Sequence, residues 1–252
     1  MGLFVAVDVG GTTSTVAVGD SDRNVRLVSE QFPTRSQEGP DATIADITTE
    51  LVRLIDELDG TLADVRQVVL ATPGPATLDG VLQGTPNLDP KLWNECPIRS
   101  LLQSALHQRH ATTTVSYLGD GQAAALGEYA VRRGQVRLDD VSPSHPEANL
   151  ESLFMVAVGT GMGGGEVRDG RVVRGRKGRA GHAGHLMLPS DAFRYPHDAQ
   201  LKVGNSLSTS ESAVSLTSLT HQLAHRLQLP QWVDHPLRLA GGSDKDKAKQ
   251  LR

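Results

Sequence analysis

The sequence predicts an α/β protein with two related lobes, and a repeated feature carries this prediction. Glycine-rich turns stand at Gly10–Thr13 and at Gly159–Gly165, and each lies between two apolar, strand-like runs. Around the first turn the order is three strands, a helix and a strand, which is typical of an α/β lobe. A glycine turn after a buried strand presents backbone N–H groups that can hold phosphate oxygens. Two such turns favour two lobes that bind one polyphosphate, with phosphoryl transfer as the chemistry.

The first lobe is predicted to begin with an antiparallel meander of three strands. Leu3–Val9 is apolar and rich in β-branched residues, as buried strands are. Val16–Val18 and Val25–Val28 continue this pattern, and a polar turn at Asp20–Asp22 separates them. We therefore expect the three runs to pair in sequence order.

Helices and further strands complete this lobe. Apolar residues recur every three or four positions over 42–58, which predicts a helix, and we expect Asp41 or Thr43 to cap it. Val65–Ala71 is the next predicted strand, and the prolines and glycine of Thr72–Pro75 end it. The next predicted elements are a helix, a strand and a helix over 98–107, 112–117 and 121–133.

The second lobe is predicted from fewer signals. A polar stretch over 134–152 favours a surface excursion, and Leu153–Val158 favours a strand. Asp169–Gly170 is typical of a type I′ hairpin turn, and Ser212–Leu229 has the periodicity of a helix. We assign residues 1–115 to the N-terminal lobe and residues 116–252 to the C-terminal lobe.

Composition argues against several classes of protein. Aromatic residues make up 4% of the 252 residues and the net charge is −4, which argues against a nucleic-acid partner. The single cysteine, Cys96, allows neither an intrachain disulfide nor a cysteine zinc cluster. Without a signal sequence or a run of about 18 apolar residues, we expect a cytoplasmic protein with no membrane partner. The basic run over 171–179 is expected to be a solvated hairpin, or alternatively a cationic rim that attracts phosphates.

The second turn also matches the dinucleotide pattern G-x-G-x-x-G, at Gly159–Gly164. That pattern requires a helix directly after it, whereas the residues here predict a hairpin. A strand–turn–strand phosphate loop fits better, with a purely structural glycine hairpin as the alternative. At the first turn, Asp8 is expected to orient Mg²⁺ through water, or else to cap the turn.

Asp120 is the candidate general base. It follows a predicted strand and precedes the small residues of a predicted helix, where ligand clefts lie in α/β proteins. A carboxylate there can accept the proton of a hydroxyl that attacks a γ-phosphoryl group. The plain alternative is a helix N-cap, a position in which aspartate is common.

Together these motifs resemble the ROK family of sugar kinases, which has the two-lobed actin-like ATPase (ribonuclease H-like) fold with a central cleft. The matching segments are the first phosphate motif at Asp8–Thr12, the P-N-L segment at Pro86–Leu88 with Trp93 nearby, the acidic A-A-A-L-G-E motif at Gly119–Glu128, the second phosphate motif at Gly159–Gly165, the glycine–histidine signature at Ala180–His185 and the E-x-x-x-S segment at Glu211–Ser215. Their order and rough spacing agree over nearly the whole chain.

The resemblance implies an ATP-dependent, Mg²⁺-assisted hexose kinase, glucokinase-like, with Asp120 as the general base. The phosphate-binding residues that it implies are Asp8, Gly10, Gly11, Thr12, Thr13, Gly159, Thr160, Gly161 and Gly163. The sugar-binding positions that it implies are Asn87, Gly119, His182, His185 and Glu211. A small hexose is therefore the expected partner. Whether the chain forms a homodimer stays open.

Several residues depart from the family pattern. Gly119 stands where the family has Asn and His182 where it has Glu, so the identity of the hexose stays open, as does the choice between ATP and polyphosphate. The family's cysteine zinc cluster has no counterpart over 201–208. His182, His185 and His197 are an alternative metal site, but a sugar-pocket role is favoured for the histidines and we expect no metal ligands.

The family also continues beyond these motifs, with a helix pair and a glycine motif that holds adenosine. The charged residues 241–252 do not match that continuation, so we expect the purine side of the nucleotide site to be missing. A degenerate or sensor protein that binds sugar without turnover is therefore the alternative to a kinase. The family's DNA-binding repressors carry a helix-turn-helix before the first phosphate motif, and the residues before Asp8 leave no room for one.

Overall fold

The computed structural model describes residues 2–85, 88–109, 111–136, 145–193, 198, 202–203 and 206–226. By their internal contacts the residues fall into two units. Unit 1 is Met1–Leu153 with Glu166–Ala180, and unit 2 is Phe154–Gly165 with Gly181–Arg252. Residues 116–153 belong to unit 1 by these contacts, and the lobe boundary at residue 115 stays a prediction.

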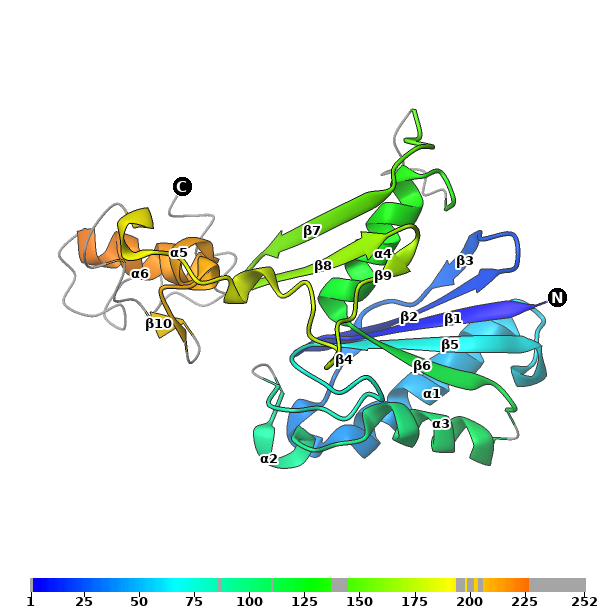
Figure 1. Ribbon diagram of the computed structural model, residues 1–252. Helices are drawn as coiled ribbons and strands as arrows, with labels where there is room; N and C mark the ends of the chain where they lie inside the picture. Colours follow the sequence, from blue (N-terminus) through cyan, green and yellow to red (C-terminus); the bar gives the residue numbers. More distant parts are fainter. Residues whose placement is uncertain are drawn as a thin grey trace. The chain divides into compact units, whose positions relative to one another are not determined.

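Unit 1 is built on a six-stranded sheet (Figure 1). Its strands are β1 Leu3–Val9, β2 Thr13–Asp20, β3 Val25–Val28, β4 Phe32–Pro33, β5 Val65–Thr72 and β6 Thr114–Gly119. The order is β3-β2-β1-β5-β6, with β4 paired to β2. The pairs β1–β2 and β2–β3 are antiparallel, which confirms the predicted meander, and the pairs β1–β5 and β5–β6 are parallel. The carboxyl ends of β1, β5 and β6 therefore meet at one end of the sheet.

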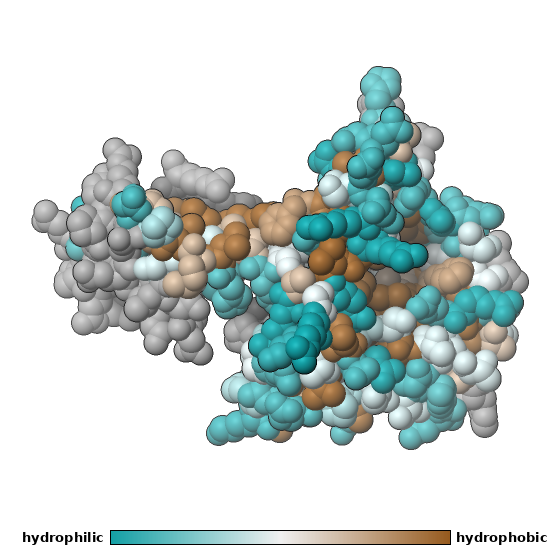
Figure 2. Space-filling model, in the orientation of Figure 1, coloured by the Kyte–Doolittle hydropathy of each residue, from teal (hydrophilic) through white to brown (hydrophobic). Residues whose placement is uncertain are grey.

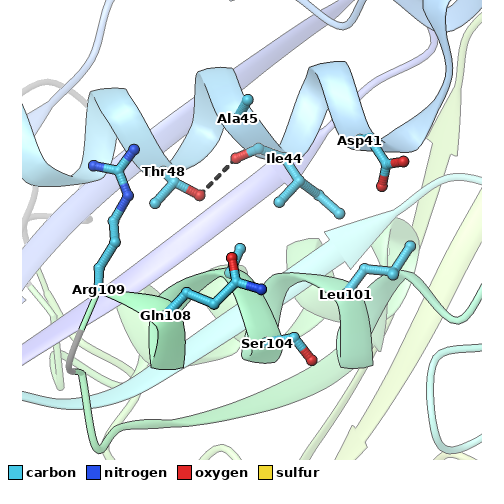
Figure 3. A pocket seen from close by; sticks show the side chains of 9 residues that line it. Asp41, Ile44, Ala45, Thr48, Leu101, Ser104, Gln108 and Arg109 are labelled. Atoms are coloured by element: carbon cyan, nitrogen blue, oxygen red, sulfur yellow. Dashed lines mark hydrogen bonds between the residues drawn. The ribbon is translucent and has the colours of Figure 1, made fainter.

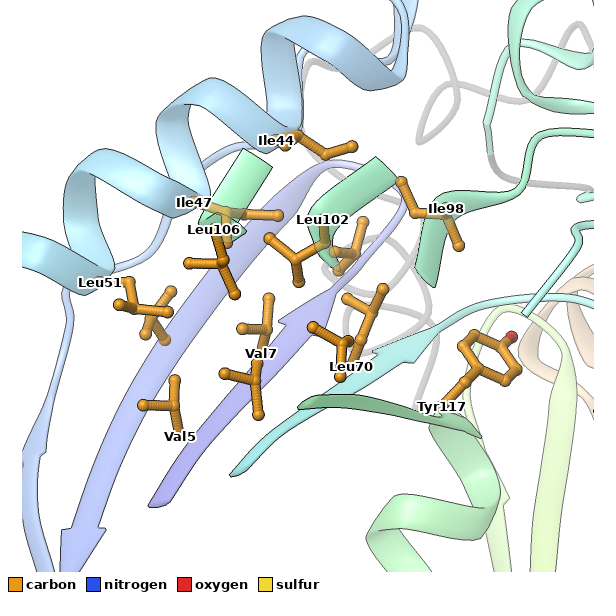
Figure 4. Packing of buried hydrophobic residues seen from close by; sticks show 14 of the residues in the cluster. Val5, Val7, Ile44, Ile47, Leu51, Leu70, Ile98, Leu102, Leu106 and Tyr117 are labelled. Carbon is orange, nitrogen blue, oxygen red and sulfur yellow. The ribbon is translucent and has the colours of Figure 1, made fainter. Parts of the chain in front are cut away.

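Two helices, α1 (Pro40–Glu57) and α3 (Ile98–Gln108), pack over one face of this sheet (Figures 1 and 4). Buried and exposed side chains alternate along β1, and its buried set, which includes Val7, lies beneath the helices. Ile47 from α1 and Leu102 from α3 are almost fully buried against it. Burying a side chain of this size contributes about 1.5–3 kcal/mol, so this layer is the main source of stability in unit 1.

The start of α1 differs from the prediction. The helix begins at Pro40, and its N-cap is Gly39, so neither Asp41 nor Thr43 is the cap. Proline suits the first helical position because it has no N–H that needs a partner there. The Thr43 hydroxyl instead donates to the carbonyl of Thr34. The residue predicted as a cap thus anchors the loop before the helix.

A second sheet has three strands in the order β7-β8-β9, and its strands contribute residues to both units. Its strands are β7 Ser152–Val158, β8 Met162–Arg168 and β9 Arg171–Val172. Asp169 and Gly170 have φ values of 48° and 72°, as a type I′ turn requires, so the hairpin prediction is confirmed. Two further helices, α2 (Pro90–Trp93) and α4 (Asp120–Arg132), belong to unit 1.

Unit 2 also contains the short hairpin strands β10 (Lys202–Val203) and β11 (Ser206–Leu207). Its helices are α5 (Ser210–Val214) and α6 (Leu216–Arg226).

The single helix predicted over Ser212–Leu229 is wrong, because the chain breaks at Ser215, where ψ is 157°. The N–H of Leu216 donates to the carbonyl of Gly159 at 2.8 Å, and the Ser215 hydroxyl oxygen accepts the N–H of Ser218 at 3.1 Å. The end of that predicted helix, residues 227–229, lies outside the described residues.

Candidate functional site

The first glycine turn is closed by its own backbone and by one buried threonine. The Gly10 N–H donates to the carbonyl of Thr13 at 2.8 Å. Thr34 donates from its hydroxyl to the carbonyl of Gly10 at 2.8 Å, and from its N–H to the carbonyl of Thr12 at 2.9 Å. A Cβ on Gly10 would lie 2.6 Å from the Thr13 carbonyl oxygen, so only glycine fits without a shift of backbone.

Thr34 is held in turn by two further hydroxyl groups. Its Oγ1 lies 2.9 Å from the Oγ of Ser14, and its carbonyl accepts from Thr43. All three side chains are buried, and buried hydroxyls need such partners because they have lost water. Sequence reasoning missed Thr34, since no motif marks it and Gly10, its partner, is 24 residues away.

Two carboxylates lie at the carboxyl ends of parallel strands in unit 1. Asp8 of β1 pairs in register with Ala71 of β5, and the next residue, Thr72, pairs with Gly119 of β6, directly before Asp120. Loss of hydration and, secondly, the negative charge of Asp120 raise the pKa of Asp8 above its usual value. The structure therefore brings the two predicted carboxylates to the same end of one sheet.

Asp120 is the first residue of α4, and the N-cap position belongs to Gly119. The Asp120 side chain is exposed, and its Oδ1 accepts the N–H of Gly121 at 2.7 Å. A carboxylate in the first turn of a helix is stabilised as the anion by the N–H groups and the helix dipole. The Asp120 side chain is thus accessible, and its hydrogen bond to the first turn of α4 fixes its direction.

Residues that sequence reasoning did not place in the site support β6, the strand that ends directly before Asp120. The Tyr117 hydroxyl lies 2.8 Å from the Oγ1 of Thr72, and burial raises the pKa of Tyr117. Arg174 is half-buried, and its Nη2 donates to the carbonyls of Tyr117 at 2.9 Å and of Leu78 at 3.0 Å. The prediction of a solvated hairpin is therefore wrong for Arg174, which ties β6 to the loop after β5.

Gln122 links α4 to the first residue of the glycine–histidine signature and to the segment just before it. Its side chain is buried, and its Nε2 donates to the carbonyls of Gly178 at 3.2 Å and of Ala180 at 3.1 Å. The sequence signal that identifies Gln122 is its position in the A-A-A-L-G-E motif, two residues after Asp120.

The second glycine turn is closed by α5 and by the first turn of α6. The Met162 N–H donates to Oε2 of Glu211 at 2.7 Å, and the Thr217 hydroxyl donates to the carbonyl of Thr160 at 2.7 Å. The Gly159 N–H donates to the carbonyl of Gly161 at 2.9 Å. Glu211, which the resemblance implies as a sugar ligand, is thus placed against the turn, with its carboxylate as an anchor.

The described residues place the predicted site in two sets. Unit 1 holds Asp8, Gly10, Gly11, Thr12, Thr13, Gly119 and Asp120, and unit 2 holds Gly159, Thr160, Gly161, Gly163, His182, His185 and Glu211. The rings of His182 and His185 are 6.1 Å apart between centroids. Asn87 and His197 lie outside the described residues. Within the described part of the chain, no three His, Cys, Asp or Glu side chains gather as a metal site.

A groove with a volume of about 340 Å³ lies between α1 and α3 (Figure 3). Asp41 lies at one end of the groove and Arg109 lies at the other end. Ile44, Thr48 and Leu101 line the part between these two residues. No predicted site residue lines this groove, so it is separate from Asp8 and Asp120. Among the described helices, none has the length and apolar character that a bilayer span requires.

The sequence matches the ROK family over residues 4–200. It is 30% identical over 190 residues to the N-acetyl-D-glucosamine kinase of Pectobacterium atrosepticum, a match of 75% of this chain and 54% of that relative. It is 28% identical over 184 residues to the N-acetylmannosamine kinase of Vibrio vulnificus, with 73% and 54% covered. The chain thus spans about half the length of the curated relatives it matches.

Solved structures agree with this assignment. The ROK hexokinase from Thermus thermophilus superimposes with a TM-score of 0.69 and 26% identity, over 99% of this chain and 72% of that one. The fold is therefore the actin-like ATPase fold, in the α/β class that the sequence predicts. Because the family match covers most of the chain, both glycine turns and Asp120, this chain belongs to the ROK family.

Proposed function

We propose that this chain serves the ATP-dependent phosphorylation of a hexose hydroxyl, with Asp120 as the general base. The observation that carries the proposal is the position of Asp8 and Asp120 at one end of the unit 1 sheet, where lost hydration and, secondly, the charge of Asp120 raise the pKa of Asp8. A carboxylate pair beside a glycine turn provides a proton acceptor and a partner for metal-bound phosphate.

Each carboxylate has its own role in this proposal. Asp120, exposed at the start of α4, accepts the proton of the sugar hydroxyl as that hydroxyl attacks the γ-phosphoryl group. Asp8 orients Mg²⁺ through water, because Mg²⁺ is commonly held by one or two carboxylates together with substrate phosphates. The cation, when bound, neutralises charge on the phosphate oxygens. A positive ion there would also relieve the repulsion between the two carboxylates.

The glycine turns are the proposed phosphate sites. Backbone N–H groups of Gly11, Thr12, Thr13, Thr160, Gly161 and Gly163 would hold the phosphate oxygens. Gly10 and Gly159, whose N–H groups donate to carbonyls within their own turns, would shape the two sites. Thr34 and Glu211 keep the two turns preformed, so binding loses less conformational entropy.

A hexose substrate is supported by the relatives, whose names specify N-acetylglucosamine, N-acetylmannosamine and, for the hexokinase, hexoses in general. Its proposed contacts are Asn87, Gly119, His182, His185 and Glu211. A glucose-like sugar, a cytoplasmic location and a role in carbohydrate metabolism belong to the same proposal.

The test is ADP release by this chain with Mg-ATP and glucose, mannose, N-acetylglucosamine, N-acetylmannosamine or fructose, against a blank without sugar. Sugar-dependent release supports the kinase and identifies its sugar. Asp120→Asn is expected to lower turnover by about 10²–10⁴-fold and to change sugar affinity only a few-fold, because the amide cannot accept the proton. Asp41→Asn makes the same change in the first turn of α1 and should leave turnover unaltered. Unchanged turnover in the Asp120 variant would exclude Asp120 as the base.

The second candidate is a sugar-binding protein without turnover. It is favoured by Gly119 and His182, which stand where the family pattern has Asn and Glu, so that two sugar contacts of the pattern are altered. Calorimetric binding of one of these sugars, together with no ADP release above the blank, would support this candidate over the kinase.

A further inference from the structure

Gln122 joins two segments of unit 1 through its side-chain amide. Its Oε1 accepts the N–H of Gly119 at 3.4 Å, and its Nε2 donates to the carbonyls of Gly178 at 3.2 Å and of Ala180 at 3.1 Å. Gln122 is 2% exposed, so water does not substitute for these partners. The amide thus uses both of its donor hydrogens and its oxygen inside the protein.

The segment that Gln122 holds ends at Ala180, where the glycine–histidine signature begins and unit 1 ends. The N–H of Ala180 donates to the carbonyl of Arg174 at 3.1 Å, so both main-chain polar groups of Ala180 have partners. Hydrophilic residues gather over β9, the strand before this segment (Figure 2), whereas the amide that holds the segment is buried. The signature therefore starts from a point that α4 fixes, two residues before His182.

The other contact of Gln122 lies at the start of α4. Gly119 is the N-cap of this helix, and Asp120 is its first residue. N–H groups at a helix start have no partner within the helix, so a side chain or water must supply one. Because Oε1 of Gln122 accepts the N–H of Gly119, it fixes the backbone directly before Asp120. One buried side chain thus holds both the start of the signature and the start of the helix that carries the proposed base.

We propose that Gln122 is a positioning residue for the sugar, which holds the start of the glycine–histidine signature against the helix start before Asp120. The role rests on the proposed function, in which Asp120 accepts the proton of the sugar hydroxyl while His182 and His185 contact the sugar. Gln122 acts through the main chain that it holds and needs no contact of its own with the sugar. Its two donors serve the signature, and its acceptor serves the start of α4.

Gln122→Glu distinguishes the role of the donors from the role of the acceptor. The carboxylate keeps an acceptor for the N–H of Gly119, but it places a charged oxygen against the carbonyls of Gly178 and Ala180. Protonation of this carboxyl group restores one donor, and burial favours the protonated form by raising its pKa. We expect the Kd for sugar to be about tenfold higher than in the unaltered chain at pH 8, and within about twofold of it at pH 5.

The measurement is the calorimetric Kd for glucose, mannose, N-acetylglucosamine, N-acetylmannosamine and fructose at pH 5 and at pH 8, as the ratio of variant to unaltered chain. The charged groups beside Gln122, which are Asp120 on α4 and Arg174, Lys177 and Arg179 around the held segment, are the same in both chains, as are the histidines. Their titration therefore cancels in the ratio. The Kd for Mg-ATP is measured alongside and should stay unchanged, because the variant leaves both glycine turns intact.

Gln103 on α3 provides the matched control. Its Nε2 donates to the carbonyl of Thr113 at 2.6 Å, and its Oε1 accepts the N–H of Val115 at 2.7 Å, which is the same kind of contact within unit 1. Gln103→Glu should leave the Kd for sugar unchanged at both pH values. Gln122→Met, which has neither donor nor acceptor there, should raise the Kd for sugar about tenfold at both pH values. It carries the test if circular dichroism shows that Gln122→Glu is unfolded at pH 8.

Two results would overturn this role and leave the kinase standing. One is a Kd for sugar that neither Gln122→Glu nor Gln122→Met changes at pH 8. The other is an equal loss of affinity for sugar and for Mg-ATP, because Gln122 would then support the fold in general. A different result, in which the unaltered chain binds none of these sugars and releases no ADP, overturns the proposed function and this role with it.

Discussion

The two glycine turns of this protein share a sequence pattern but are closed by different chemistry. In unit 1 neutral groups of Thr34 hold the carbonyls of Gly10 and Thr12. In unit 2 the carboxylate of Glu211 accepts a hydrogen bond from the N–H of Met162. A neutral anchor leaves the positive potential of a turn intact, whereas a carboxylate adds negative charge where a phosphate would bind. The anchor of the first turn therefore adds no charge of its own, whereas the anchor of the second turn adds one negative charge.

The glycines of the two turns also differ in the room that they leave for a side chain. Gly10 has no room for a Cβ, because the Thr13 carbonyl oxygen would be 2.6 Å away. At Gly159 and Gly163 a Cβ would meet no heavy atom of the described residues within 4 Å. Packing thus requires glycine at position 10 of the first turn and at position 164 of the second, where a Cβ would lie 2.7 Å from the Met155 carbonyl oxygen. At Gly159 and Gly163, by contrast, glycine leaves the backbone open to a ligand.

The largest expected effect is that of Gly10→Ala. The forced shift of the turn is expected to lower the free energy of unfolding of unit 1 by about 1–3 kcal/mol, as overpacking does. Urea unfolding followed by Trp93 fluorescence measures it, in a chain whose other tryptophan, Trp232, is replaced by Phe. Gly159→Ala should leave unfolding unchanged and weaken only Mg-ATP binding. Equal destabilisation by both variants would contradict the contrast between the turns.

Thr34→Val is expected to have the next largest effect. It removes the hydroxyl that donates to Gly10 and meets Ser14, and it leaves those buried groups without that partner. The free energy of unfolding of unit 1 should fall by about 1–3 kcal/mol. Thr49→Val, which removes an exposed hydroxyl on α1 that donates to the carbonyl of Ala45, is the control and should change it by much less.

Two substitutions of Glu211 distinguish the effect of its charge from the effect of its hydrogen bond to the second turn. Glu211→Ala removes the acceptor of the Met162 N–H, and should lower the free energy of unfolding of unit 2 by about 1 kcal/mol. Glu211→Gln keeps an acceptor and removes the charge, so stability should hold while the Kd for Mg-ATP falls by roughly threefold, as expected from one less negative charge at short range. Isothermal calorimetry at two salt concentrations measures this. Weaker nucleotide binding by the Gln variant would show that the charge is not the obstacle.

Asp8→Asn is expected to have the smallest effect and the opposite sign. Because lost hydration and the charge of Asp120 raise the pKa of Asp8, the folded chain holds this proton more tightly than the unfolded chain. Stability from this group therefore falls as pH rises from the ordinary value of 3.8 through the raised pKa. At pH 7 the variant should be more stable by about 0.5 kcal/mol or less, because solvent screens the charge of the exposed Asp8 side chain, and below pH 3.8 the difference should vanish. Melting temperatures from pH 3.5 to 7 measure it, with Asp56→Asn on α1 as the control.

Local patterns were sufficient for much of the fold. The alternation along β1, the three-to-four spacing of α1 and α3, and the Asp169–Gly170 turn each depend on neighbours in sequence. The same is true of the glycine turns and of Asp120 between a strand and a helix. Periodicity and turn chemistry act over a few residues, so the sequence by itself determined these elements, their order and the family resemblance.

Only the tertiary structure decided how these elements are anchored. Thr34 closes the first turn, Arg174 holds β6, and the helix predicted over Ser212–Leu229 breaks because Leu216 donates to Gly159. Each of these contacts joins residues that are far apart along the chain, and a buried donor takes whichever acceptor the fold brings near it. A sequence pattern records the residue types on one segment, but it does not contain the distance to another segment, and that distance decides which hydrogen bond forms.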